Sequence, residues 1–268
     1  MTNPAAKIVN EPDRAQQLIT FEQPLTERMR TFLRLEFLFR QAAHHSAGQS
    51  TWEMRAAVSG LLEILAILTR GDIRKDVLHE LERYANDLEN FRTRPGVDNA
   101  RLAALLTSVQ SLRDRLNGCN KQLTRKLADC EFLSSVRHRS AIPGGTCEFD
   151  LPDYSFWLSR SYTERRQDFD QWMDALGPLR EAVNKLLWLT RESAESQEQL
   201  AIAGMYQQTL ARGAGVQLLR VALPQDSEVF PEISGNQHRF TVRFQRWRDI
   251  GSRPTQTSDD TRFLLTCC

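Results

Sequence analysis

Residues 140–152 read SAIPGGTCEFDLP, and the character of the sequence differs on the two sides of this segment. Pro143 lacks a backbone donor and disfavours a helical conformation at Ile142, while Gly144 and Gly145 tolerate backbone angles closed to other residues. The long helical pattern before the segment is therefore predicted to end here. Strand-like alternation follows it, so the segment is predicted to be a loop that separates a helical part from a strand-containing part.

Capping signals divide the first half of the chain into helices. The spacing of Ser50 and Glu53 is that of a capping box, and Asp72 and Asp98 are placed to cap two further helices. A last helix is predicted over about 123–140, where it ends in basic residues. The first helix of the chain is predicted to bury one face, formed by Met29, Phe32, Leu33 and Phe37.

Between Pro152 and Ala203 the pattern is mixed. The aromatic stretch 154–158 favours a short strand. Ser161 and Glu164 repeat the capping-box spacing and predict another helix, which Gly177-Pro178 separates from the helix after it.

The clearest strand lies near the C-terminus. Apolar residues alternate there with basic or polar ones, in the run Arg239, Phe240, Thr241, Val242, Arg243 and Phe244. Such alternation predicts one apolar face and one basic face. Residues 216–223 and 262–268 are predicted to supply further strands. Because no long helix separates these late strands, the sheet is predicted to be antiparallel and the protein to be α+β, with a helical domain and a mostly C-terminal sheet domain.

The predicted domain organisation follows from these elements. The first residues are polar and contain Pro4 and Pro12, which is typical of a mobile extension. The predicted parts are an extension at 1–17, a mainly helical domain at 18–140 that the helices of 161–200 rejoin, and a strand domain made of 141–160 and 203–268.

The composition is that of an ordinary globular protein, with 41% hydrophobic and 26% charged residues. No apolar run approaches the roughly 18 to 20 residues that span a bilayer, and the N-terminus lacks the apolar core of a signal peptide. The five cysteines do not form a secreted disulfide framework. We therefore expect a cytoplasmic protein with reduced thiols and no membrane segment.

No catalytic motif is visible. The sequence lacks a phosphate-binding loop, a Gly-x-Ser-x-Gly elbow and a His-Glu-x-x-His zinc site. Cys147, near the basic residues 137–139, is either an activated thiolate or, as we favour, a buried structural cysteine. Cys267 and Cys268 are adjacent rather than spaced as a metal hook. We expect no enzyme activity, no catalytic residues, no metal and no cofactor.

Arginine dominates the basic residues, since 30 of the 35 are arginine. Arginine suits planar, bidentate contact with carboxylates or phosphates. Arg239 and Arg243 would lie about 13 Å apart on one face of their strand, which fits an extended partner across the sheet or a merely solvated face. A nucleic-acid-binding module is the alternative, but the aromatic residues here point to the opposite face, which weakens a base-stacking platform.

Two longer segments carry a family resemblance. Residues 142–152 (IPGGTCEFDLP) and 21–31 (FEQPLTERMRT), with 230–235 (FPEISG) and the terminal cysteine pair, resemble the ZapD family of cell-division proteins. The resemblance runs in the same order from about Phe21 to the end. It implies a non-enzymatic factor of the divisome and of septation, placed at mid-cell. Such a factor would bind the C-terminal tail of FtsZ and, as a homodimer, bundle FtsZ filaments in the Z-ring.

The resemblance also implies a basic surface for the partner. The positions that match it best are Arg239, Arg243, Arg70, Arg74 and Arg34, followed by Arg137 and Arg139. The sequence departs from the family's pattern at Glu131 and Ser155, in two neighbourhoods where that surface is basic.

Overall fold

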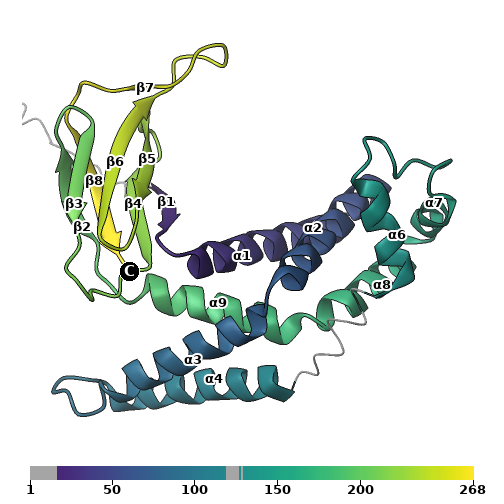
Figure 1. The fold of residues 1–268 in the computed structure, drawn as a ribbon, viewed down its shortest axis with the longest axis horizontal. Helices are drawn as coiled ribbons and strands as arrows, with labels where there is room; N and C mark the ends of the chain where they lie inside the picture. Colours follow the sequence, from purple (N-terminus) through teal and green to yellow (C-terminus); the bar gives the residue numbers. More distant parts are fainter. Residues whose placement is uncertain (1–16, 119–126, 128) are drawn as a thin grey trace, which may run out of the picture. The chain divides into compact units, whose positions relative to one another are not determined.

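The computed structural model of the chain describes residues 17–118, 127 and 129–268, which form two compact units (Figure 1). The helical unit comprises Glu27–Ser193, and the strand unit comprises the described residues up to Thr26 together with Ala194–Cys268. All strand pairs are antiparallel. The α+β fold class predicted from the sequence is therefore confirmed. Apart from Gln17, the extension predicted at 1–17 lies outside the described residues.

The described helices all belong to the helical unit. They are α1 (Glu27–Ser46), α2 (Thr51–Arg70), α3 (Ile73–Glu89), α4 (Asn99–Gly118), α6 (Glu131–Ser140), α7 (Pro152–Ser159), α8 (Tyr162–Asp174) and α9 (Gly177–Arg191). The pairs α1–α2 and α3–α4 pack as hairpins, and α9 packs against α1, α3 and α4. Their core is apolar and includes the fully buried side chains Phe32, Phe39, Leu61, Leu65 and Leu81. Among the described residues, no helix is both long and apolar enough to cross a bilayer.

The predicted caps are present. The Ser50 hydroxyl accepts a hydrogen bond from the Glu53 backbone amide at 3.1 Å, and the Glu53 carboxylate accepts one from the Ser50 amide at 3.0 Å. Ser161 and Glu164 form the same reciprocal pair, and Asp72 accepts from the Lys75 amide. These bonds satisfy amides that the first turn of a helix leaves free, which explains where the helices begin.

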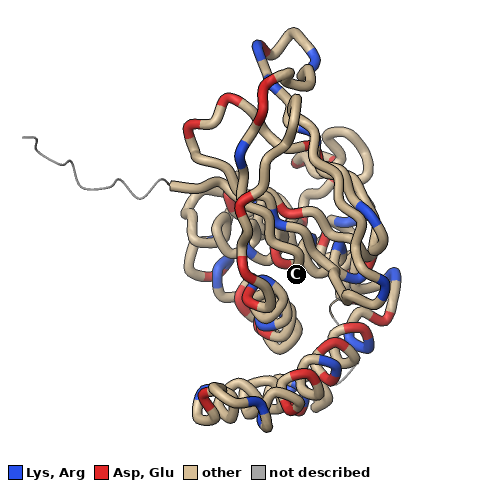
Figure 2. Tube along the Cα trace, turned by 90° about the vertical axis from the view of Figure 1, so that its left-hand side faces the viewer, with Lys and Arg blue, Asp and Glu red and all other residues tan. Residues whose placement is uncertain are grey.

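A buried carboxylate connects α1 to α3. Glu80 of α3 is only 3% exposed and accepts hydrogen bonds from Arg28 of α1 and, at 2.9 Å, from Arg83 of α3. A second pair joins α9 to α1, where Arg191 donates to both carboxylate oxygens of Glu36 at 2.7 Å. Figure 2 shows that acidic and basic residues are otherwise interspersed along these helices.

Residues 141–151 form a loop, as predicted for this part of the chain, but the chain does not change to strands after it. Gly144 has a φ of 73°, and a Cβ at Gly145 would lie 2.4 Å from the Arg139 carbonyl oxygen, so both glycines are needed. The strand predicted at 154–158 is wrong, because these residues form α7. The segment 141–160, expected in the strand domain, lies within the helical unit.

Aromatic packing explains this correction. Pro152 starts α7, and Tyr154 and Trp157, three residues apart, share its buried face. Their rings contact Phe132 of α6, and Trp157 also contacts Trp172 of α8, with centroids 5.5 to 5.9 Å apart. The aromatic residues that favour a strand in isolation are here the apolar stripe of a short helix.

The strand unit contains two sheets. Its strands are β1 (Leu18–Pro24), β2 (Gln197–Ala201), β3 (Met205–Thr209), β4 (Leu218–Pro224), β5 (Val229–Gly235), β6 (Arg239–Arg246), β7 (Thr255–Gln256) and β8 (Thr261–Cys267). One sheet has the order β1-β4-β8-β2, and the other has the order β3-β6-β5 with β7 beside β6. The two sheets share one core, formed by Val221, Phe263 and Leu265 of the first and Phe240, Val242 and Phe244 of the second.

Several boundaries differ from the sequence prediction. Helix α9 ends at Arg191 and β2 begins at Gln197. The range 161–200 predicted for these helices is therefore too long at its C-terminal end. The short strand β1, expected within the helical domain, pairs with β4 in the strand unit. Of the helix predicted at 123–140, α6 covers 131–140, and most of the rest lies outside the described residues.

Candidate partner-binding surface

The strand β6 positions the two leading arginines. It lies between β3 and β5, and its residues Phe240, Val242 and Phe244 are at most 1% exposed in the core. Because side chains alternate along a strand, Arg239 and Arg243 project from the opposite, outer face and are exposed. The apolar and basic faces predicted for this strand are confirmed.

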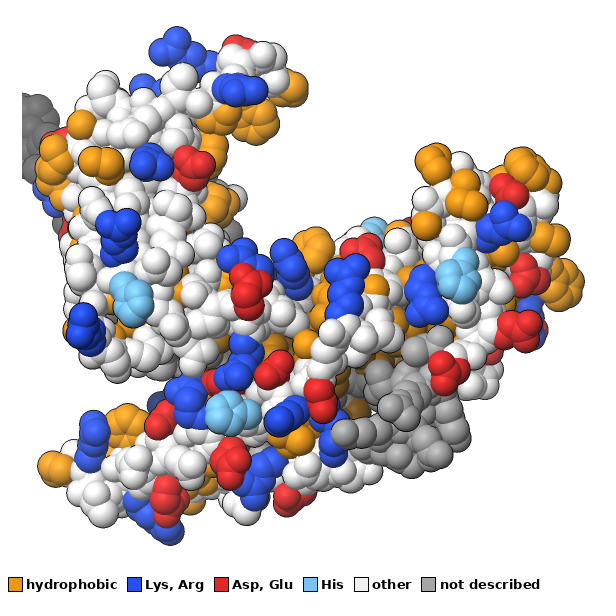
Figure 3. Space-filling view, viewed as in Figure 1, with side chains coloured by type: hydrophobic (Ala, Val, Ile, Leu, Met, Phe, Trp, Pro, Cys, Tyr) orange, Lys and Arg blue, Asp and Glu red, His pale blue; other side chains and the backbone are white. Residues whose placement is uncertain are grey.

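The outer face around Arg239 and Arg243 is mostly polar, apart from the 46% exposed Met205 of β3 in register with Arg243, and it carries little negative charge. The residues in register with β6 on the neighbouring strands include Thr209, Gln207, Ser234 and Glu232. Glu232 is the residue opposite Arg243, and its carboxylate accepts a hydrogen bond from Gln245 at 3.1 Å. Within the described part of the chain, no ion pair involves Arg239 or Arg243. Figure 3 shows basic side chains separated by uncharged surface on the face of the strand unit turned to the viewer.

The next arginine on β6 has a different environment. Arg246 forms ion pairs with Asp259 at 3.1 Å and Glu228 at 3.7 Å. It therefore connects β6 to the segments before β5 and after β7. The positive charge available to a partner on this strand is that of Arg239 and Arg243.

Two predicted arginines of the helical unit are also exposed. Arg34 lies on α1 and Arg70 is the last residue of α2. Because α1 and α2 form a hairpin, the end of α2 lies at the same end of the pair as the start of α1. The ion pairs found among the described residues include neither side chain.

Arg74 instead contacts the end of a neighbouring helix. Its Nε donates to the Leu116 carbonyl oxygen, and a terminal nitrogen donates to that of Asn117, both at 2.9 Å. These carbonyls belong to the last turn of α4, which lacks helical partners for them. The guanidinium is thus engaged in holding α3 to α4.

The second-rank arginines are weakly engaged at the end of α6. Arg137 donates to the Ser134 hydroxyl at 3.4 Å, and Arg139 lies 3.7 Å from a carboxylate oxygen of Asp150. The Arg139 contact joins the helix end to the loop of 141–151. Both pairs are solvent-accessible and hold their partners loosely.

The cysteines have structural surroundings. The Cys147 thiol donates to the Asp150 carboxylate at 3.6 Å. Burial raises the pKa of the Cys267 thiol, and Cys268 continues the pairing of β8 with β4 through its backbone. Within the described ranges, no group of three or more histidine, cysteine or acidic side chains is arranged to hold a metal ion.

The sequence prediction missed an exposed aromatic surface. Trp52, Phe149 and Phe156 are 73 to 86% exposed, and the first two line an open pocket of about 600 Å³ with Arg55. Arg55 donates to the Thr146 carbonyl oxygen at 3.0 Å and fixes the glycine loop. Nothing in the local sequence of α2 marks Trp52 as exposed.

Comparison with known proteins gives consistent matches. Residues 33–243 match a family model described as "ZapD: Cell division protein". A protein of Methylococcus capsulatus is 44% identical over 250 residues, covering 93% of this chain and 98% of its own length. A protein of Azoarcus sp. is 38% identical over 251 residues, covering 94% and 99%. Both relatives are named "Cell division protein ZapD".

Proposed function

The chain belongs to the ZapD family of cell division proteins, and from this premise we propose that it binds the C-terminal tail of FtsZ and cross-links FtsZ filaments. In this proposal it is a non-enzymatic factor that acts in the cytoplasm, at the division site, where bundling stabilises the Z-ring. The parts of the proposal are the tail-binding face, the second binding site that bundling requires, and the arginines that contribute.

The observation that carries the proposal is the pair Arg239 and Arg243 on the outer face of β6. Both guanidinium groups are exposed and lie outside the ion pairs of the described residues. A polypeptide tail in extended conformation matches the repeat of a strand, and arginine binds carboxylates with two parallel hydrogen bonds. Because the core anchors the rest of β6, the two cations are held at a fixed spacing for such a tail.

The helical unit contributes a second set of contacts in this proposal. Arg34 and Arg70 are exposed, and we assign them to the same basic surface. Arg137 and Arg139 rank behind them because each already has a weak partner. Arg74 is the least available, since it binds the end of α4.

Cross-linking needs two tail-binding sites in one particle. A homodimer supplies them by two-fold symmetry, and we propose this as the active form. A weak contact with each tail is then sufficient, because simultaneous contacts along a polymer multiply the apparent affinity.

The test is co-sedimentation of this protein with polymerised FtsZ, using full-length FtsZ and a version that lacks the C-terminal tail. We expect the protein to pellet and to bundle filaments only when the tail is present. Equal pelleting with both versions would contradict tail binding. Absence from both pellets, together with salt-sensitive retention on nucleic acid, would replace the proposal by the nucleic-acid alternative.

Charge reversal locates the surface. Arg239→Glu and Arg243→Glu are each expected to lower the affinity for the FtsZ tail at least about 10-fold, because a repulsive charge replaces a charge-assisted hydrogen bond. Tail-dependent pelleting measures this affinity. The matched control is Arg262→Glu, an arginine that is 79% exposed on the other sheet. Circular dichroism shows whether each variant is folded. Unchanged pelleting of folded Arg239→Glu and Arg243→Glu proteins would remove β6 from the site.

A further inference from the structure

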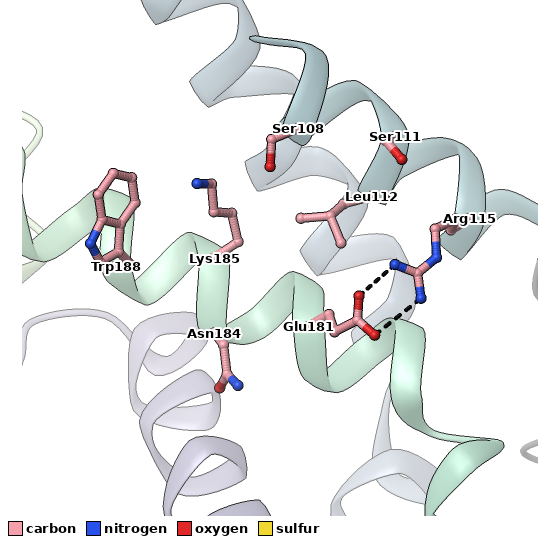
Figure 4. A pocket seen from close by; sticks show the side chains of 8 residues that line it. All are labelled: Ser108, Ser111, Leu112, Arg115, Glu181, Asn184, Lys185 and Trp188. Carbon is pink, nitrogen blue, oxygen red and sulfur yellow. Dashed lines mark hydrogen bonds and ion pairs between the residues drawn. The ribbon is translucent and has the colours of Figure 1, made fainter. Parts of the chain in front are cut away.

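A pocket in the helical unit, separate from the arginine surfaces, has the composition of an anion site. It lies between α4 and α9 and has a volume of about 600 Å³. Figure 4 shows its residues, with serines on α4 facing charged and aromatic side chains on α9. The lining residues include Ser108, Leu112, Arg115, Glu181, Lys185 and Trp188.

Two of the charged side chains neutralise each other. Both carboxylate oxygens of Glu181 accept hydrogen bonds from Arg115, one of them at 3.1 Å. Hydrogen bonding to Arg115 also holds the pKa of Glu181 below its ordinary value, so the carboxylate stays ionised and occupied. This pair closes one end of the pocket and contributes no net charge.

The positive charge of Lys185 has no such partner. Its ammonium lies 4.2 Å from the centroid of the Trp188 ring, and none of the ion pairs among the described residues includes it. Partial burial lowers the pKa of Lys185 because the charged form loses hydration. A carboxylate placed beside the ammonium would restore the lost stabilisation.

The remaining lining suits a peptide better than an inorganic anion. The hydroxyl of Ser108, across the pocket from Lys185, makes no hydrogen bond with the described residues and can donate one to a carboxylate (Figure 4). Trp188 is 37% exposed and offers an apolar surface beside the cation, whereas Leu112, which also lines the pocket, is buried. An inorganic anion would leave this apolar surface in water, whereas an acidic residue followed by an apolar one would cover it.

We propose that the α4–α9 pocket binds an acidic peptide segment of a partner protein, with a carboxylate at Lys185 and Ser108 and a neighbouring apolar side chain on Trp188. The pocket is open, which fits a segment lying across the surface. This site goes beyond the proposed FtsZ-tail surface and does not depend on it, because none of its residues belongs to that surface.

The test uses the full-length chain labelled with 5-fluorotryptophan and ¹⁹F NMR. The chain has five tryptophans, and the signal lost in Trp188→Phe identifies Trp188. The probes are acetyl-Glu-Phe-Glu-amide and the uncharged acetyl-Gln-Phe-Gln-amide. We expect a saturable shift of the Trp188 signal with the acidic peptide and none with the neutral one. Equal shifts with both peptides, or none with either, would overturn the proposal.

Substitution of the lysine separates this site from general anion binding. Lys185→Gln should lower the affinity for the acidic peptide about 10-fold, because a charge-assisted contact is lost. The matched control is Lys75→Gln, the same substitution on α3, and it should leave binding unchanged. The other four tryptophan signals report that each variant is folded. Unchanged binding by Lys185→Gln, or an equally strong Trp188 shift with inorganic phosphate, would refute an acidic-peptide site.

Discussion

Single side chains in the helical unit make the stability of the protein depend on pH. Tyr154 is 2% exposed, and burial raises its pKa from 10.0 to about 12, although the Arg55 guanidinium, 4.9 Å above its ring, acts in the opposite direction. The folded state therefore keeps the phenolic proton at pH values where the unfolded state has lost it. Stability is fully present below pH 10 and falls as the pH rises toward 12.

Tyr154→Phe should remove this alkaline loss. The wild type is expected to lose about 1.4 kcal/mol through this residue by pH 11, since each pKa unit corresponds to about 1.4 kcal/mol. Urea unfolding of both proteins at pH 8 and pH 11 measures this loss. The free energy of unfolding of the variant, relative to that of the wild type, should be larger at pH 11 than at pH 8. If the difference in free energy of unfolding between the two proteins did not change with pH, the pKa of Tyr154 would be ordinary in the folded protein.

The buried Glu80 carboxylate supports the contact of α1 with α3. Glu80→Gln removes the buried carboxylate that Arg28 and Arg83 share and leaves them only Asp76 and Asp87, which are 44% and 50% exposed, so we expect a loss of about 3 kcal/mol in the free energy of unfolding. Asp87→Asn is the matched control, because Asp87 pairs with the same Arg83 but is half exposed. Its cost should be about 0.5 kcal/mol or less. Similar costs for the two variants, measured in urea, would contradict the role of burial.

The junction of α2, α3 and α4 contains two neighbouring arginines with different environments. Arg70 is exposed at the end of α2, whereas Arg74 donates to carbonyls of α4. Arg74→Ala should lower the free energy of unfolding by about 1 to 2 kcal/mol and leave FtsZ binding intact, because two carbonyls lose their donors. Arg70→Ala should show the reverse, with weaker bundling and unchanged stability. Thermal unfolding and FtsZ co-sedimentation on both variants check this, and a shared loss of binding would return Arg74 to the partner surface.

Elements whose signals are local were predictable from the sequence. The capping pairs Ser50–Glu53 and Ser161–Glu164 mark helix starts because their hydrogen bonds span three residues. The alternation in β6 was sufficient to assign Arg239 and Arg243 to an exposed face, which is the part of the candidate site that sequence alone could supply.

Elements that depend on distant contacts were not predictable. The sequence of α7 favours a strand, and only the contacts of its aromatic residues with α6 and α8 explain why it is a helix. The strand β5 contains Pro231, which argues against a central strand and is tolerated here because β5 lies at the edge of its sheet. Phe37 was predicted on the buried face of α1, yet it is 65% exposed, and Leu35 and Leu38 are buried instead. The Lys185 pocket likewise exists only because α4 and α9 pack together.

The whole molecule is an insertion arrangement. The helical unit occupies the chain between β1 and β2 of the strand unit. The first sheet is complete only when β1 pairs with β4. The apolar residues Val221 and Leu223 of β4 lie in register with Phe21 and Ile19 of β1. The strand unit is therefore built from both ends of the described chain.

A fragment experiment tests this arrangement. Residues 194–268 alone are expected to aggregate, because β4 becomes an unprotected edge strand. Joining residues 17–26 to this fragment through a Gly-Ser linker should give a monomeric, cooperatively folding unit. Size-exclusion chromatography and thermal unfolding compare the two fragments. A well-folded 194–268 fragment would mean that β1 is dispensable.

The position of β8 in the chain also determines when the first sheet can form during synthesis. β1 leaves the ribosome roughly 200 residues before β4, which at about 5 to 20 residues per second is a wait of about 10 to 40 s. The helical unit has its own core and is translated in this interval, whereas the first sheet still lacks β8, the strand that lies between β4 and β2. Because β4 and β2 are joined in the sheet only through β8 (Thr261–Cys267), a chain that stops before β8 would carry a folded helical unit attached to an incomplete sheet.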